Sequence, residues 1–314
     1  LSDFSAILTL GTGTFARVLL VQRRGTNEFY ALKRLLKADI VRLQQVDHVN
    51  NERSILAVIN FPFIVNLRCT FHDDRFLYIL LDYVPGGELF SHLRRYQKFP
   101  FYVAQFYSSE VTLALEYLHA QNIIYRDLKP ENILIGVDGH IKLADFGFAK
   151  RVVDRTYTLC GTSAYLAPEI ITGGGHTKAV DWWAMGILVY EMLVGAPPFD
   201  DENPVTIYAK ILESKINFPQ FVGKVERDFI RRLLNSDLTR RLGNMRGGAV
   251  DVRMHPFFER IDWTAVLQRR YQPPIVPPYK HPGDSSNFER YPEQPVRTTL
   301  EPGEQSYNEL FPGF

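Results

Sequence analysis

Apolar and polar positions divide the chain into a strand-rich first part and a helix-rich second part. Over residues 5–37, short apolar runs alternate with glycine-containing turns, which is typical of strands. The continuous apolar run Phe76–Leu81 predicts one more strand. Between them, apolar residues at helical spacing predict a single main helix over about residues 44–59.

Two long helices dominate the predicted second part. Residues Phe101–Ala120 have an amphipathic pattern, whereas Ala179–Val194 is apolar on nearly all sides and predicts a helix buried in the core. Amphipathic helices continue to about residue 258, and a short strand, Ile141–Ala144, precedes Asp145. We therefore expect an α+β fold with a small β-rich lobe and a larger, mainly helical lobe.

The composition changes near residue 262. Prolines at 273, 274, 277, 278, 282 and 292 disfavour regular structure, so we expect an extended C-terminal tail over residues 262–314. The aromatic residues Phe311 and Phe314 suggest that this tail packs back on the body. A turn-rich joint at 82–87 is the expected hinge between a first lobe at 1–81 and a second at 88–261.

Composition and charge describe an ordinary globular protein. The chain has 314 residues, is 46% hydrophobic and 23% charged, and carries a net charge of +1. No bulk charge indicates nucleic acid or a membrane surface, and no apolar run has membrane-spanning length. The two cysteines, Cys69 and Cys160, form no metal motif, which fits a reducing compartment. We expect a cytoplasmic or nuclear protein, with Cys69 as a core thiol and the possibility of a missing N-terminal extension.

Chemistry is concentrated in the stretch Tyr125–Asn132. Asp127 can accept a proton from a hydroxyl, Lys129 can neutralise a phosphoryl group, and Asn132 can ligate a metal ion. Asp145 follows a predicted strand and is the expected second ligand, because Mg²⁺ prefers carboxylate, amide and phosphate oxygens. As a lone motif this stretch could also be a polar loop, so its partners along the chain decide the interpretation.

The first strands supply such partners. Gly11 and Gly13 can let backbone amides approach phosphates, although a lone pair of glycines is weak evidence. The strand-like sequence after them disfavours a dinucleotide-binding fold, which needs a helix there. A lysine at a strand end is usually solvated, but a pair between Lys33 and Glu52 of the predicted helix could hold Lys33 against nucleotide phosphates.

Taken together, these motifs resemble a eukaryotic protein kinase over the whole chain, with its bilobal fold. The subgroup features resemble the AGC group of Ser/Thr kinases and are similar to the catalytic subunits of cyclic-AMP-dependent kinases. The residues that carry the resemblance are Gly11, Gly13, Lys33, Glu52, Tyr125–Asn132, Asp145–Gly147, Leu159–Thr162, Ala167–Glu169, Asp181–Trp183, Arg241, Asn287–Phe288 and Phe311–Phe314.

The resemblance implies ATP and Mg²⁺ as ligands. It places adenine among Val18, Ala31, Leu134 and Phe288, with backbone hydrogen bonds at Asp82 and Val84. Alternatives are another basophilic AGC kinase or a pseudokinase scaffold. A pseudokinase normally lacks one of Lys33, Asp127 and Asp145, and all three are present.

Regulation is expected at Thr158, where a phosphate could bind Arg126, Lys150 and His48. Thr156 is expected to be an ordinary exposed residue. By resemblance, Thr299 occupies a phosphorylation position of the tail.

Three acids, Glu88, Glu131 and Glu191, are expected to bind arginines of protein substrates that precede the acceptor Ser or Thr. The isolated Glu88 could also be a solvated charge, whereas Glu191 interrupts an apolar helix and should need a cationic partner. The resemblance adds Leu159 and Leu166 to the substrate site.

The resemblance also implies a cyclic-AMP-binding regulatory subunit as a partner. Tyr208 is retained for that contact, whereas Tyr157 is divergent. The chain departs from the family pattern at four further positions. Ala196 and Asp200 replace aromatic residues that receive the family's inhibitor peptide, which puts its affinity in doubt. Ala164 removes an acidic contact for distant basic residues of the substrate, and Ser163 alters the pocket for the residue after the acceptor.

Overall fold

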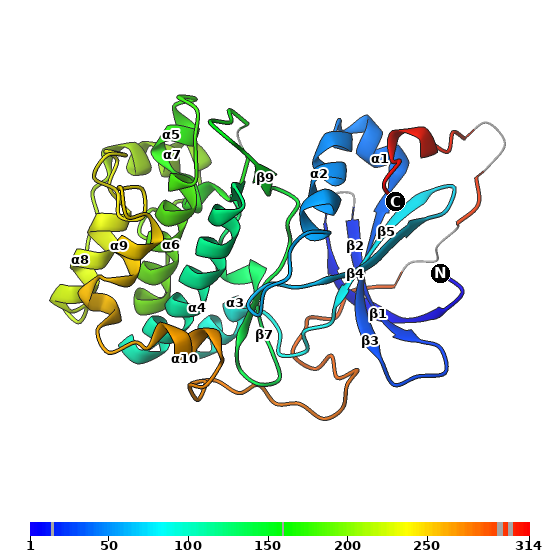
Figure 1. Ribbon diagram of the computed structural model, residues 1–314, viewed down its shortest axis with the longest axis horizontal. Helices are drawn as coiled ribbons and strands as arrows, with labels where there is room; N and C mark the ends of the chain where they lie inside the picture. Colours follow the sequence, from blue (N-terminus) through cyan, green and yellow to red (C-terminus); the bar gives the residue numbers. More distant parts are fainter. Residues whose placement is uncertain (14–15, 159, 294–297, 301–303) are drawn as a thin grey trace.

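The small lobe is built on one antiparallel sheet. The computed structural model describes residues 1–13, 16–158, 160–293, 298–300 and 304–314. The sheet has the order β1-β2-β3-β5-β4, and two helices, α1 (Lys37–Arg42) and α2 (Val46–Leu56), follow β3 (Figure 1). The strands are β1 (Phe4–Thr12), β2 (Ala16–Arg23), β3 (Phe29–Leu36), β4 (Leu67–His72) and β5 (Phe76–Asp82). The predicted strands and main helix are confirmed, while the six-residue α1 was not predicted.

The large lobe is organised around α6 (Ala179–Val194), which is buried along almost its entire length because apolar side chains cover nearly every side. It packs against α4 (Phe101–Ala120), and both helices have the bounds that the sequence predicts. The remaining helices are α3 (Leu89–Tyr96), α5 (Pro168–Ile171), α7 (Pro204–Glu213), α8 (Lys224–Leu233) and α9 (Ala249–Arg253). Two small antiparallel sheets of two strands each lie at the cleft between the lobes. One pairs β6 (Ile123–Ile124) with β9 (Lys150–Arg151), and the other is the hairpin of β7 (Ile133–Ile135) and β8 (Ile141–Leu143).

The tail is not entirely irregular. Helix α10 (Trp263–Leu267) forms at its start because the Asp262 carboxylate accepts hydrogen bonds from the backbone N–H groups of Thr264 and Ala265. The prediction of a tail without regular structure from residue 262 is therefore wrong for this segment.

Beyond α10 the tail crosses the hinge and reaches the small lobe, where its end lies beside α1 (Figure 1). The amide of Asn287 donates to the Pro85 carbonyl at 3.0 Å, and the Glu293 carboxylate accepts from the backbone N–H of Thr9 at 2.6 Å. Phe311 is only 2% exposed and meets the half-buried Phe314 edge to face. The expectation that the terminal aromatics pack on the body is confirmed.

Two side-chain predictions are wrong. Cys69 is exposed, because β4 is the edge strand of the sheet and leaves this thiol outside the core. Thr156 is buried rather than exposed, because a backbone bridge to His176 draws it into the large lobe. Among the described residues, no helix is long and apolar enough to cross a membrane.

Candidate active site

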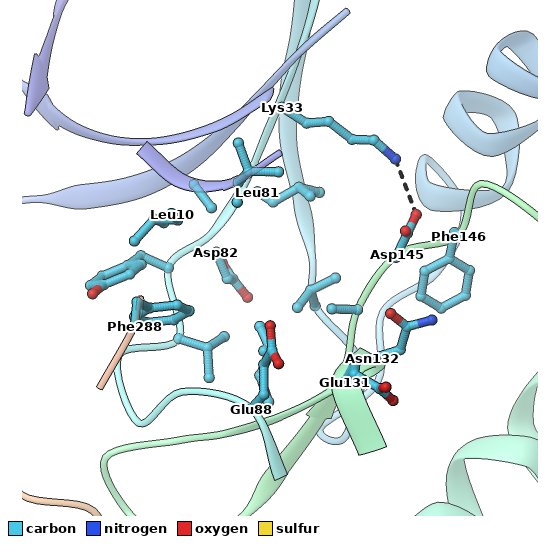
Figure 2. A pocket seen from close by; sticks show the side chains of 18 of the residues that line it. Leu10, Lys33, Leu81, Asp82, Glu88, Glu131, Asn132, Asp145, Phe146 and Phe288 are labelled. Carbon is cyan, nitrogen blue, oxygen red and sulfur yellow. Dashed lines mark hydrogen bonds and ion pairs between the residues drawn. The ribbon is translucent and has the colours of Figure 1, made fainter. Parts of the chain in front are cut away.

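A cavity of about 200 Å³ lies between the two lobes and collects most of the expected nucleotide residues (Figure 2). Its apolar lining comes from both lobes and from the tail, which contributes Phe288. The expected adenine contacts all line it, namely Val18, Ala31, Asp82, Val84, Leu134 and Phe288. Gly11 also lines the cavity, whereas Gly13 is not among the residues that do.

Lys33 connects the two sides of this cavity. Its ammonium lies 2.6 Å from the Glu52 carboxylate of α2 and 3.1 Å from the Asp145 carboxylate, toward which it points in Figure 2. Burial alone would lower the pKa of Lys33, but the Asp145 and Glu52 carboxylates outweigh it and raise that pKa. The same ammonium lowers the pKa of Asp145. The predicted Lys33–Glu52 pair is present, and at neutral pH Lys33 is a fixed positive charge.

The loop after β6 holds the expected reactive groups in direct contact. The Asn132 amide nitrogen donates to the Asp127 carboxylate at 2.7 Å, and the Lys129 ammonium lies 3.0 Å from the same carboxylate. Lys129 also donates to the Thr162 hydroxyl at 2.9 Å. Asp127 is only 4% exposed and these contacts fix its position, on the loop whose residues Glu131 and Asn132 line the cavity. Sequence reasoning did not find the role of Thr162.

A buried carboxylate beneath this loop holds the loop's backbone in place through hydrogen bonds. The Asp181 carboxylate of α6 accepts hydrogen bonds from the backbone N–H groups of Tyr125 at 3.0 Å and Arg126 at 2.8 Å. Arg126 has φ of +67°, a conformation that costs energy in a residue with a side chain. The hydrogen bonds that Asp181 accepts from the two backbone N–H groups offset the cost of this conformation. Sequence reasoning missed this role, although a charged residue in an otherwise apolar helix was a usable signal.

The donor set fits a magnesium ion shared with a nucleotide. Both hydrogen bonds of Asn132 use its amide nitrogen, so its amide oxygen is the candidate ligand. Asp145 offers a half-exposed carboxylate. The described residues contain no cluster of three His, Cys, Asp or Glu side chains that could hold a metal by themselves. One carboxylate and one amide suit Mg²⁺, which is usually completed by phosphates and water.

Of the three acids predicted for substrate recognition, Glu88 and Glu131 line the cavity, and Glu191 does not. Burial, followed by the charges of Glu131 and Glu289, raises the pKa of Glu88 to about 7. Burial also raises the pKa of Glu191, and Glu131 adds to that effect. Glu131 therefore lies within electrostatic reach of both. Within the chain, Glu191 accepts a hydrogen bond from the Tyr165 hydroxyl, and the charge of Arg94 lowers its pKa, while the substrate arginine expected as its partner stays a prediction.

Arg126, Lys150 and His48 form a basic cluster next to Thr156, which is two residues before the half-buried Thr158. Burial lowers the pKa of His48, and the nearby charges of Arg126 and Lys150 lower it further. Lys150 donates to the Thr156 hydroxyl at 3.1 Å. Helix α2, which carries His48, lies beside β9 (Figure 1). The three groups expected to receive a phosphate are therefore neighbours.

The remaining residues named from the sequence lie in environments separate from those described above. The Glu169–Arg241 pair is bidentate, at 2.6 and 2.9 Å, and Arg241 is fully buried. Leu166 is 4% exposed, and Leu159 lies outside the described residues. Thr299 is exposed, Tyr208 is half-buried, and Tyr157 is 69% exposed.

Comparisons with known proteins agree with this geometry. The family described as "Protein kinase domain" matches residues 4–258. Over 314 residues the chain is 54% identical to the cAMP-dependent protein kinase catalytic subunit PRKX of Homo sapiens, covering all of this chain and 87% of that protein. It is 55% identical over 294 residues to the cAMP-dependent protein kinase catalytic subunit of Dictyostelium discoideum, covering 94% of this chain and 45% of that protein. It is 48% identical over 315 residues to the cAMP-dependent protein kinase type 3 of Saccharomyces cerevisiae, covering all of this chain and 79% of that protein.

Proposed function

The chain belongs to the protein kinase family, as a serine/threonine kinase of the cAMP-dependent type, and we propose that its cleft transfers the γ-phosphoryl group of ATP to arginine-directed Ser or Thr residues. The observation that carries this proposal is the position of two groups of charges around one cavity. Lys33, Glu52 and Asp145 lie on its inner side, and Asp127 and Asn132 lie on the loop that borders it. We assign residues 1–81, 82–87, 88–261 and 262–314 to the small lobe, hinge, large lobe and tail.

In the proposed step, the substrate hydroxyl oxygen forms a bond to the γ-phosphorus. The bond from that phosphorus to the bridging oxygen breaks, and ADP leaves with the electron pair. Asp127 accepts the hydroxyl proton, and the hydrogen bond from Asn132 keeps its carboxylate oriented. Lys129, which lies 3.0 Å from that carboxylate, neutralises charge on the transferring group.

Nucleotide binding combines an apolar surface with fixed charges. Val18, Ala31, Leu134 and Phe288 would enclose adenine, and Lys33 would contact the α- and β-phosphates. Mg²⁺ held by Asn132 and Asp145 would supply charge neutralisation to the phosphates. Asp145 and Glu52 hold the Lys33 ammonium in place before the nucleotide arrives.

Substrate choice follows from the acids beside the cavity. A guanidinium pairs with carboxylates in bidentate geometry, so Glu88 suits an arginine at the third position before the acceptor, and Glu191 with Glu131 suits one at the second. Tyr165 engages only one oxygen of Glu191. Replacing each arginine of a peptide by alanine should lower kcat/KM about ten- to hundredfold, and equal rates would contradict this recognition.

Phosphorylation of Thr158 is the proposed switch. A phosphate adds about −1.5 to −2 charge, which Arg126, Lys150 and His48 can balance. Arg126 is adjacent to Asp127, so a phosphate that fixes Arg126 should also fix the position of the proton acceptor Asp127. Thr158→Ala should lower activity, and fully active protein without phosphate on Thr158 would refute the switch.

Two further elements belong to the same proposal. The exposed Thr299 is the candidate phosphorylation position of the tail, which mass spectrometry of the purified chain can test. A cAMP-binding regulatory subunit is the proposed partner, with Tyr208 in the contact, and a pull-down with and without cAMP tests it.

Asp127→Asn separates the catalytic proposal from a kinase-like scaffold that only binds ATP. Turnover should fall about 10²–10⁴-fold, since a positioned proton acceptor is typically worth that factor, while ATP affinity measured by titration stays unchanged. Near-normal kcat in the variant would reject Asp127 as the proton acceptor.

A further inference from the structure

His176 lies beside the basic cluster of Arg126, Lys150 and His48, although no sequence motif marks it. The residue is 2% exposed, and its backbone forms both hydrogen bonds of an antiparallel bridge with Thr156, at 3.1 and 2.8 Å. Directly opposed residues of such a bridge place their side chains on the same face. The imidazole of His176 therefore lies beside the Thr156 hydroxyl, which accepts from Lys150.

Two buried nitrogen atoms of this region lack hydrogen-bond partners among the described residues. They are Nε2 of His176 and Nη1 of Arg126. The Nε of Arg126 is used, since it donates to the Phe148 carbonyl at 2.7 Å. A buried polar atom without a partner destabilises the fold, and a charged one does so more strongly, so an arrangement with two such atoms calls for a ligand.

The electrostatic surroundings identify the ligand as an anion. Burial, followed by the charge of Arg126, lowers the pKa of His176 to about 4. Lys150 acts in the same direction, while Glu169 and Asp181 act against it. Both acids already have partners, because Glu169 pairs with Arg241 and Asp181 accepts from the backbone of Tyr125 and Arg126. A negatively charged group is therefore the missing complement of the cluster.

Thr158 can supply that anion, because it is two residues after Thr156 and half-buried. We propose that His176 is a direct ligand of the phosphate on Thr158, donating through Nε2 alongside Arg126. This inference rests on the proposed Thr158 switch and adds to it a ligand from the segment before α6. His176 thereby joins the phosphorylated segment to the start of the central helix of the large lobe.

The experiment compares phosphorylated and dephosphorylated forms of the full chain. His176→Phe keeps an aromatic ring of similar size but cannot donate, and His176→Gln keeps a donor. His281→Phe, at an exposed histidine of the tail, is the matched control. The readouts are the rate at which a broad-specificity phosphatase removes the Thr158 phosphate and the Tm gain that this phosphate confers.

His176→Phe should accelerate phosphate removal about tenfold or more, the factor expected for a lost hydrogen bond to a charged group. It should also reduce the Tm difference between the two forms, whereas a merely structural role would lower both Tm values equally. His176→Gln should restore part of the protection, and His281→Phe should behave like the parent chain. In ³¹P spectra, the second pKa of the phosphate should rise in His176→Phe, because a donor to the dianion is lost.

The failure of this inference is distinguishable from failure of the switch. If Thr158 carries no phosphate in fully active protein, both are wrong. If Thr158 is phosphorylated and Thr158→Ala is impaired, but His176→Phe shows unchanged phosphate removal and an unchanged Tm difference, the switch stands and the role of His176 is refuted.

Discussion

Arginine recognition by this kinase should depend on pH, because burial and neighbouring acids hold the pKa of Glu88 at about 7. The carboxylate binds a substrate arginine only when it is ionised. A pKa raised above the ordinary value means that the ionised form is present above about pH 7 and is lost as pH falls through that value. The contribution of Glu88 to specificity should therefore be present at pH 8 and mostly lost at pH 6.

The size of the effect follows from the ionised fraction. With a pKa of about 7, roughly 90% of Glu88 is ionised at pH 8 and roughly 10% at pH 6. The kcat/KM for peptide reports the free enzyme, so the advantage of an arginine three positions before the acceptor should fall about tenfold over this range. Arginine itself stabilises the ionised form, so kcat at saturating peptide should change less.

The assay measures kcat/KM between pH 6 and 8 for two peptides that differ only by arginine or alanine at that position. Using their ratio cancels the titration of all groups that affect both peptides. Glu88→Gln should abolish the pH dependence of the ratio and lower it at pH 8. A ratio that is constant with pH in the parent chain, or one that still varies in Glu88→Gln, would refute the reasoning.

Three further predictions concern the site and its support. Glu169→Gln should cost about 3–5 kcal/mol of stability in denaturant unfolding, because it leaves the fully buried Arg241 charge without its partner. Replacing both residues, as Glu169→Leu with Arg241→Met, should cost less, and equal losses would contradict this reasoning. Glu52→Gln should lower kcat/KM for ATP about ten- to hundredfold, because it releases Lys33, whereas Glu28→Gln on the exposed surface should not. An unchanged kcat/KM in Glu52→Gln would show that the Lys33–Glu52 pair is dispensable. Phe311→Ala should lower Tm, because it removes a ring that is only 2% exposed, at a cost of up to about 3–5 kcal/mol of stability. Tyr279→Ala, at an exposed residue, is the control, and equal Tm values for the two variants would mean that Phe311 does not anchor the tail.

The local pattern of apolar residues was sufficient to predict the bounds of helices whose side chains are largely buried. Helices α4 and α6 begin and end where the apolar pattern does, since their side chains are covered on most sides and no neighbouring element changes the period. The short α1 has a mixed sequence of six residues, Lys37–Arg42, too few for a helical period to be recognised.

Other features depend on neighbours that are distant in sequence. Cys69 has the pattern of a core strand, but its exposure depends on β4 being at the sheet edge. The burial of Thr156 comes from a bridge to His176, 20 positions away, and the hydrogen bond on Glu191 comes from the Tyr165 hydroxyl, 26 positions away. The motif residues were recognisable because their types and order fit the expected chemistry. The support from Thr162 becomes visible only through its contact, and that from Asp181 was signalled only by a charged residue in an apolar helix.

The central claim is that this chain transfers a phosphoryl group to a hydroxyl of a basic peptide. The direct measurement incubates the purified chain with Mg²⁺, ATP and a peptide that has arginines two and three positions before a single Ser, and follows ADP release together with peptide mass. We expect ADP and singly phosphorylated peptide in equal amounts, with the phosphate on that Ser, dependence on Mg²⁺, and loss of both products in Asp127→Asn. ADP without phosphopeptide, or no turnover in chain phosphorylated at Thr158, would contradict it.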